Sequence, residues 1–100
     1  IGMDKRIGDK FLQPGPGYGG SCFPKDTLAM RQMARNAGCE SKLIEATVDS
    51  NNQRKMQMAE KVKEALDGSV SGKTIAVLGL TFKPGTDDMR ESPSLIIVPE

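Results

Sequence analysis

The sequence predicts a mostly α-helical chain that passes, near its end, into the first strand and loop of an α/β unit. Three features predict this order. Apolar residues recur at helical spacing in two segments between residues 26 and 66, a β-branched run occupies residues 74–80, and glycine and proline are dense over residues 11–21. We therefore expect part of a helical unit over residues 1–68 and the start of an α/β unit over residues 69–100.

The bulk composition narrows the class of protein. The chain has 100 residues, of which 37% are hydrophobic, so its own core is expected to be modest. Fourteen basic residues against thirteen acidic ones give a net charge of +1, which provides no electrostatic reason to expect nucleic acid or a membrane as a partner. No apolar run approaches the roughly 18 residues that span a bilayer, and no signal-peptide pattern opens the chain. We expect a soluble, cytoplasmic protein.

The first part of the chain is expected to hold the end of one helix and the whole of another. Residues 1–10 are interpreted as the tail of a helix that ends at Gly8. After the loop, Asp26 is predicted as the N-cap of the next helix, because a carboxylate there accepts hydrogen bonds from free N–H groups and faces the positive end of the helix dipole. Gly38 is predicted to end that helix, since glycine readily adopts the left-handed conformation of a C-terminal cap.

A longer helix is predicted from Lys42 to about Leu66, with Ser41 as its cap. Its apolar stripe is thin, and polar residues between Asn51 and Lys55 interrupt it. A long helix with a thin stripe is expected to pack against further chain or against a partner.

The last third of the chain is predicted to form the start of a Rossmann-like domain. Residues 74–80 are predicted to form a buried parallel strand, because the run is short, apolar and β-branched and is bounded by glycines. A polar loop is expected over residues 81–93, and a helix is expected to begin within residues 94–98. A strand, a loop and a helix start form the first unit of an α/β nucleotide-binding fold.

The sequence GYGGSCFPKD, residues 17–26, carries the strongest chemical signal. Its glycines let a ligand approach the main chain closely, and it places Cys22 beside Lys25 and Asp26. Nearby cations and helix N-termini favour the thiolate form of cysteine, which makes Cys22 a candidate nucleophile. The alternatives are a buried structural cysteine, a solvated Lys25 and an Asp26 that only caps its helix.

Cys39 lies between the two predicted helices without such surroundings, and it is interpreted as a small packing residue. Both cysteines are expected to be reduced, although a thiol switch between Cys22 and Cys39 is a rival function. The chain has no histidine, which excludes an imidazole-bound zinc site and a Cys–His catalytic pair within these residues. Asp87 and Asp88 alone are weak evidence for a metal, and we predict none.

Two blocks of sequence resemble the UDP-glucose/GDP-mannose dehydrogenase family. The first comprises DKRIG at residues 4–8 and FLQPGPGYGGSCFPKD at residues 11–26, and the second is GLTFKPGTDDMRESP at residues 79–93. The resemblance covers nearly the whole chain and implies an internal piece of a longer NAD-dependent enzyme. It implies oxidation of the C6 alcohol of UDP-glucose to the carboxylate of UDP-glucuronate, with two NAD⁺ consumed per turnover. It also implies a homodimer formed through the central helices.

The resemblance assigns roles to individual residues as well. Cys22 is implied to form a thiohemiacetal and then a thioester, and Asp26 to act in the acid–base steps around thioester hydrolysis. Lys25 and Arg90 are implied to contact NAD, and Lys83 the nucleotide sugar. The remaining substrate contacts implied are Phe11, Leu12, Gln13, Pro14, Gly15 and Gly19.

Several alternatives remain open. Phe11 and Leu12 can equally anchor their loop to the core, and Lys83 and Arg90 can belong to a solvated charge cluster. GDP-mannose or a UDP-N-acetyl sugar can replace UDP-glucose as the substrate. A non-catalytic assembly module, with residues 41–67 as a partner interface, is a rival function. No Gly-x-Gly-x-x-Gly follows the predicted strand, and the family's NAD-binding domain is not found here, so these residues alone are expected to be inactive.

Overall fold

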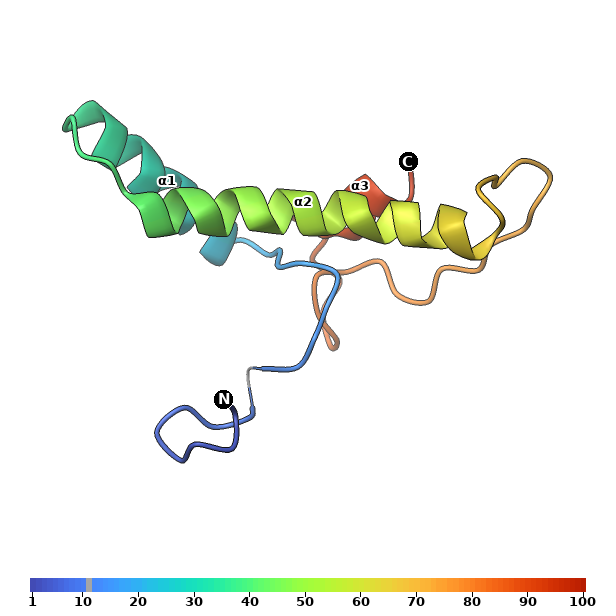
Figure 1. Ribbon diagram of the computed structural model, residues 1–100, viewed down its shortest axis with the longest axis horizontal. Coiled ribbons are helices and arrows are strands. Elements are labelled where there is room, and N and C mark those ends of the chain that lie inside the picture. The colour runs from blue at the N-terminus through green and yellow to red at the C-terminus, as the bar shows by residue number, and fades with distance from the viewer. Residues whose placement is uncertain (11) are drawn as a thin grey trace.

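The computed structural model describes residues 1–10 and 12–100. Within them lie three helices: α1 (Phe23–Asn36), α2 (Lys42–Ala65) and the short α3 (Ser94–Ile97). α1 and α2 run in opposite directions as a helical hairpin, and α3 packs beside the C-terminal half of α2 (Figure 1). The mostly helical fold class predicted from the sequence is confirmed.

The start of α1 differs from the prediction. Cys22, and not Asp26, occupies the N-cap position, and Pro24 lies in the first turn. Proline suits this place because its missing N–H is not needed there and its fixed φ matches that of a helix. The helix therefore begins one turn earlier than predicted, and Asp26 becomes an acidic residue inside the first turn whose N–H donates to the Cys22 carbonyl (2.8 Å).

The connection between the two long helices follows the prediction. Gly38 adopts a φ of 67° just after α1, and its N–H donates to the Arg35 carbonyl (3.1 Å). Ser41 stands at the N-cap of α2, although its side chain makes no capping hydrogen bond. α2 has 24 residues, which at 1.5 Å per residue gives a rod of about 36 Å.

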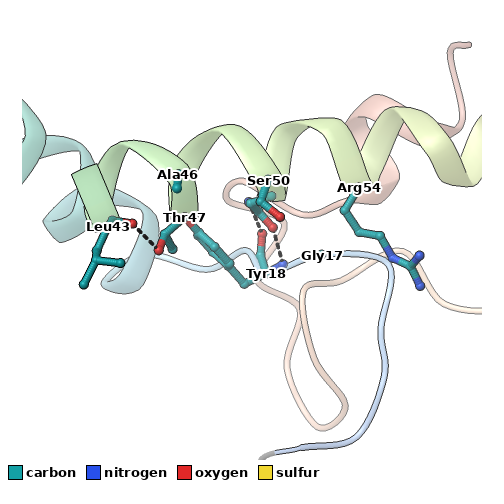
Figure 2. A pocket seen from close by; sticks show the side chains of 8 residues that line it. Gly17, Tyr18, Leu43, Ala46, Thr47, Ser50 and Arg54 are labelled. Atoms are coloured by element: carbon teal, nitrogen blue, oxygen red, sulfur yellow. Dashed lines mark hydrogen bonds between the residues drawn. The ribbon is translucent and has the colours of Figure 1, made fainter. Parts of the chain in front are cut away.

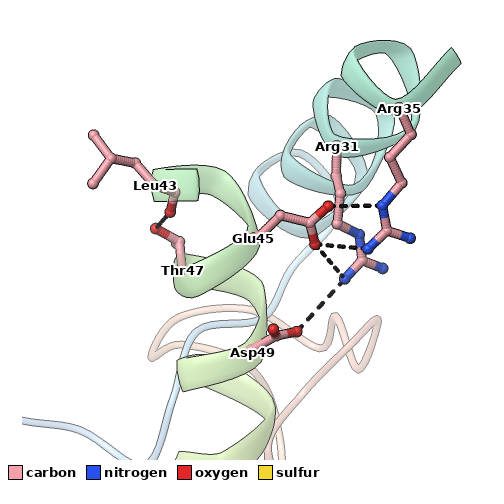
Figure 3. A network of polar contacts seen from close by, with 6 residues as sticks. All are labelled: Arg31, Arg35, Leu43, Glu45, Thr47 and Asp49. Atoms are coloured by element: carbon pink, nitrogen blue, oxygen red, sulfur yellow. Dashed lines mark hydrogen bonds and ion pairs between the residues drawn. The ribbon is translucent and has the colours of Figure 1, made fainter. Parts of the chain in front are cut away.

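Charged side chains hold the hairpin together close to the connection between its two helices (Figure 3). The Glu45 carboxylate accepts two hydrogen bonds from Arg35, both at 2.7 Å, and this pairing raises the pKa of Arg35. Arg31 lies 3.9 Å from Glu45 and 3.8 Å from Asp49. Two arginines of α1 thus face two carboxylates on the first turns of α2.

The core is small. Val48 and Ala59 are the only buried hydrophobic residues in the described part of the chain, and Thr27, Asn51, Lys55 and Ser92 are buried polar residues. The Cα radius of gyration is 16.3 Å, whereas a compact domain of this length has about 13 Å. The thin apolar stripe therefore buries little within this chain.

The helix tail predicted for residues 1–10 is not present. The segment forms turns, in which the N–H groups of Ile7 and Gly8 both donate to the Asp4 carbonyl at 3.0 and 2.9 Å. One turn fixes several dihedral angles for very few hydrogen bonds, so a short isolated segment gains too little to remain helical.

The predicted strand at residues 74–80, and with it the Rossmann-like unit, is not confirmed. No strand occurs within residues 1–10 and 12–100, and the run is exposed, with Ile75 at 46%, Val77 at 50% and Leu78 at 96% exposure. A strand requires a neighbour to accept and donate its main-chain hydrogen bonds, and no such neighbour lies beside this segment. The expected helix start after the loop is confirmed as α3. None of the described helices has the length and apolar character needed to cross a membrane.

Candidate active site

Cys22 lies on the surface at the N-terminus of α1. Its Sγ is 3.6 Å from the Ser21 hydroxyl, and neither it nor Cys39 is in a disulfide. Within this chain, the exposure argues against the interpretation of Cys22 as a buried structural cysteine. Cys39 is exposed too, so its interpretation as a packing residue is wrong within this chain.

The first turn of α1 places an ammonium group and a carboxylate, those of Lys25 and Asp26, near the Cys22 thiol. Asp26 stands four residues after Cys22, a spacing that places both on one side of a helix. Lys25 Nζ is 3.3 Å from Asp26 Oδ1, and their side chains are 72% and 69% exposed. The three residues singled out in the sequence thus share one solvent-facing helix end.

A second loop, residues 80–94, is closed at its base by hydroxyl groups. Ser92 is 1% exposed and its Oγ donates to the Leu80 carbonyl (2.6 Å), to which the Ser94 hydroxyl also donates. Within the loop, the Phe82 N–H donates to the Asp88 carbonyl (3.2 Å). Sequence reasoning gave Ser92 no role, because a single serine in a polar loop carries no signal of burial.

The side chain of Arg90 is oriented on this loop by Asp88, which lies two residues before it. Its Nε and one terminal nitrogen donate to the two Asp88 carboxylate oxygens at 3.0 and 2.8 Å. The pair lowers the pKa of Asp88 to about 2 and raises the pKa of Arg90.

The loop of residues 12–22 that leads to Cys22 (the cysteine loop) and the loop of residues 80–94 (the Arg90 loop) are in direct main-chain contact. The Gly20 N–H donates to the Arg90 carbonyl (2.8 Å). A methyl group on Gly19 would come within 2.4 Å of the Glu91 carbonyl oxygen, and one on Gly20 within 2.7 Å of the Phe82 ring. These two glycines are therefore required for the close approach of the loops, a reason separate from the substrate contact predicted for Gly19.

Two cavities lie along this junction. The first, of about 380 Å³, is lined by Lys25 and Arg90, together with Gly20, Ser21, Pro24, Leu28 and Glu91. Two cations beside a helix N-terminus and a glycine suit an anionic diphosphate. The second, of about 240 Å³, lies between Pro16 and Gly17 on one side and residues 79–82 and α3 on the other.

The predicted substrate loop is mostly exposed. Leu12 is 45% exposed and packs on the Gly2 backbone, while Gln13, Pro14 and Gly15 are exposed and Phe11 lies outside the described residues. Arg54 of α2 donates to the Gly15 carbonyl (3.1 Å). Lys83 is exposed, with Nζ 5.3 Å from the centre of the Phe82 ring. No hydrogen bond within the described residues joins these side chains to Cys22.

Sequence reasoning missed two buried polar residues on α2. Asn51 bonds to both main-chain groups of Tyr18, and Lys55 donates to the Glu91 carbonyl (3.1 Å). Figure 2 shows the Tyr18 ring extending along α2 toward Thr47, in an open groove of about 550 Å³. Their positions in the sequence could have indicated this burial, because both residues interrupt the apolar stripe of α2 at places where an amphipathic helix buries its side chains.

An exposed cysteine at a helix N-terminus, beside a basic cavity, is typical of an enzyme that forms a covalent intermediate and binds a phosphorylated ligand. Family comparison agrees with this class. Residues 1–53 match the central domain of the UDP-glucose/GDP-mannose dehydrogenase family, and residues 76–100 match the UDP binding domain of that family. The chain belongs to the UDP-glucose/GDP-mannose dehydrogenase family.

Individual relatives align with nearly the whole length of this chain. A UDP-glucose 6-dehydrogenase of Rhizobium meliloti is 57% identical over 98% of this chain, and the UDP-glucose 6-dehydrogenase TuaD of Bacillus subtilis is 52% identical over 99%. A solved UDP-glucose dehydrogenase from Pyrobaculum islandicum aligns with a TM-score of 0.89 at 41% identity over 98% of this chain. The matches cover 22%, 21% and 22% of those proteins, respectively.

Proposed function

We propose that these residues serve, within a full-length protein, an NAD-dependent oxidation of the C6 alcohol of UDP-glucose to the carboxylate of UDP-glucuronate. The observation that carries the proposal is the junction of the two loops, where the Gly20–Arg90 hydrogen bond (2.8 Å) brings the loop that carries Arg90 against the loop that carries the nucleophilic cysteine. The high identity to UDP-glucose 6-dehydrogenases favours UDP-glucose over GDP-mannose or a UDP-N-acetyl sugar.

In this proposal Cys22 acts on the aldehyde that the first oxidation leaves at C6. Its thiolate adds to the carbonyl carbon and forms a C–S bond, which gives a thiohemiacetal. Loss of a hydride from that carbon and of the hydroxyl proton gives a thioester. Water then attacks the thioester carbon, the C–S bond breaks, and the carboxylate leaves as the thiol is restored. Asp26, on the same side of the helix, accepts a proton from that water.

The residues present fit a dinucleotide cofactor. Lys25 and Arg90 would hold the diphosphate of NAD in the cavity of about 380 Å³ that they line, with Gly20 leaving room for it to approach. When bound, NAD⁺ supplies the hydride acceptor for both oxidations. The nucleotide sugar would bind along residues 12–15 and Gly19 and reach Lys83. The cavity of about 240 Å³ lies next to these residues in the chain and is lined in part by Pro16, Gly17 and Phe82.

The wider organisation follows the same proposal. Residues 1–68 form part of the central domain and residues 69–100 begin the UDP binding domain, which the two family matches on either side support. A homodimer through the helices is supported by the exposed face of α2, where Leu43 is 83% exposed beside an open groove. If the full-length protein has the mass of a monomer in sedimentation experiments, the dimer proposal is refuted. Two free cysteines are typical of the reducing cytoplasm.

The test is NADH release by the full-length protein with UDP-glucose, GDP-mannose and UDP-N-acetyl sugars. We expect two NADH per UDP-glucose and loss of turnover in Cys22→Ser. Cys39→Ser is the matched control, because Cys39 is also free and exposed but lies after the far end of α1, and it should keep the parent rate. Equal NADH release by Cys22→Ser and the parent would refute the thioester route, and another preferred sugar would correct the substrate.

A further inference from the structure

α2 holds the two loops of the site with two side chains that lie one helical turn apart. Asn51 accepts a hydrogen bond from the Tyr18 N–H (2.7 Å) and donates one to the Tyr18 carbonyl (3.2 Å). Lys55 donates from Nζ to the Glu91 carbonyl (3.1 Å). One side chain therefore holds the main chain of the cysteine loop, and the other holds the main chain of the Arg90 loop.

The burial of Lys55 requires an explanation. The residue is 2% exposed, less than either buried hydrophobic residue of the core. Removing an ammonium group from water is costly, so packing alone would favour an apolar side chain at this position. A hydrogen bond from a charged donor to a carbonyl is stronger than a neutral one and offsets part of that cost. The bond to Glu91 is thus the contact that the lysine supplies and an apolar residue could not.

The acceptor belongs to a strained part of the loop. Glu91 has a φ of 53°, a left-handed conformation that residues with a side chain seldom adopt. The preceding carbonyl, that of Arg90, accepts from the Gly20 N–H (2.8 Å). Two consecutive carbonyls are therefore fixed, one by α2 and one by the cysteine loop, and the Arg90 side chain projects from the Cα atom directly before the first of them.

We propose that Lys55 is a positioning residue of the dehydrogenase reaction, which holds Glu91 in its left-handed conformation and thereby sets Arg90 against the cysteine loop. The inference rests on the proposed function, in which Arg90 contacts NAD. Lys55 itself touches neither the sulfur nor the cavity lined by Arg90. Its influence on the reaction therefore passes through the loop.

The test is a double-mutant cycle in the full-length enzyme. Lys55→Met keeps the length of the side chain and removes the donor, and we expect KM for NAD⁺ to rise about tenfold, the size of one lost hydrogen bond from a charged group. Arg90→Ala should raise KM for NAD⁺ as well, and the double variant should be no worse than Arg90→Ala alone. Lys55→Arg, which retains a charged donor, should restore most of the affinity. Lys61→Met, exposed on the same helix, is the matched control.

The outcomes separate positioning from mere stability. If the double variant shows the product of the two single fold-changes in KM for NAD⁺, the two residues act independently and the inference is overturned. A lowered melting temperature of Lys55→Met with an unchanged KM for NAD⁺ would overturn it as well. Amide exchange over residues 17–22 gives a readout that needs no turnover: Lys55→Met should increase exchange at the Gly20 N–H, and unchanged exchange would refute the link between Lys55 and the cysteine loop. Absence of NADH from the unsubstituted enzyme would instead refute the proposed function, and the exchange result would still decide whether Lys55 holds the loops together.

Discussion

Replacement of Gly19 by alanine tests the contact between the two loops. The added methyl group would lie 2.4 Å from the Glu91 carbonyl oxygen, 2.9 Å from its carbonyl carbon and 3.1 Å from Ser92 Cα. All three are main-chain atoms, so no side chain can rotate away. Because Cβ atoms do not approach closer than 3.0 Å, the loops must separate by about 0.6 Å to accommodate the methyl group. A shift of that size lengthens the Gly20–Arg90 hydrogen bond from 2.8 Å to the limit of such bonds.

Overpacking of this kind costs about 1–3 kcal/mol in free energy of unfolding. We expect Gly19→Ala to lose that amount in denaturant unfolding of the full-length protein and to lower the rate of NADH formation. Gly15→Ala is the control for stability, because a methyl group there meets no atom within 4 Å, and its change should stay within about 0.5 kcal/mol. If the two variants unfold at the same denaturant concentration, the reasoning from loop contact is wrong.

Two further predictions concern charged pairs. Glu45→Gln removes the paired hydrogen bonds to Arg35, which is 55% exposed, so we expect a loss of only about 0.5–1 kcal/mol in the free energy of unfolding. Denaturant unfolding should show this loss shrinking in 1 M salt, whereas Glu64→Gln on the exposed side of α2 should have no effect. The bond with Arg90 lowers the pKa of Asp88 from 3.8 to about 2, so its stabilising effect is complete above about pH 4 and is lost as the pH falls toward 2. The melting temperatures of the parent and Asp88→Asn should therefore converge over this range, and a constant difference would contradict the assignment.

Local sequence signals predicted the elements whose causes are local. The apolar spacing and Gly38 define the α1–α2 hairpin, and the long helix begins after Ser41 as expected. The start of α1 was misplaced because Asp26 and Pro24 are both good N-terminal residues, and the proline decided the outcome. The strand at residues 74–80 was predicted from composition, but strand formation depends on a pairing partner, which no local pattern supplies.

The candidate site divides in the same way. The sequence alone determined that a cysteine, a lysine and an aspartate share the start of one helix, since their spacing within a single turn settles it. Only the tertiary structure brought the loop of residues 80–94 against the cysteine loop and placed Asn51 and Lys55 beneath both. The reason is physical: helix spacing follows from the covalent chain, whereas contacts between segments more than 30 residues apart depend on the packing of the whole molecule.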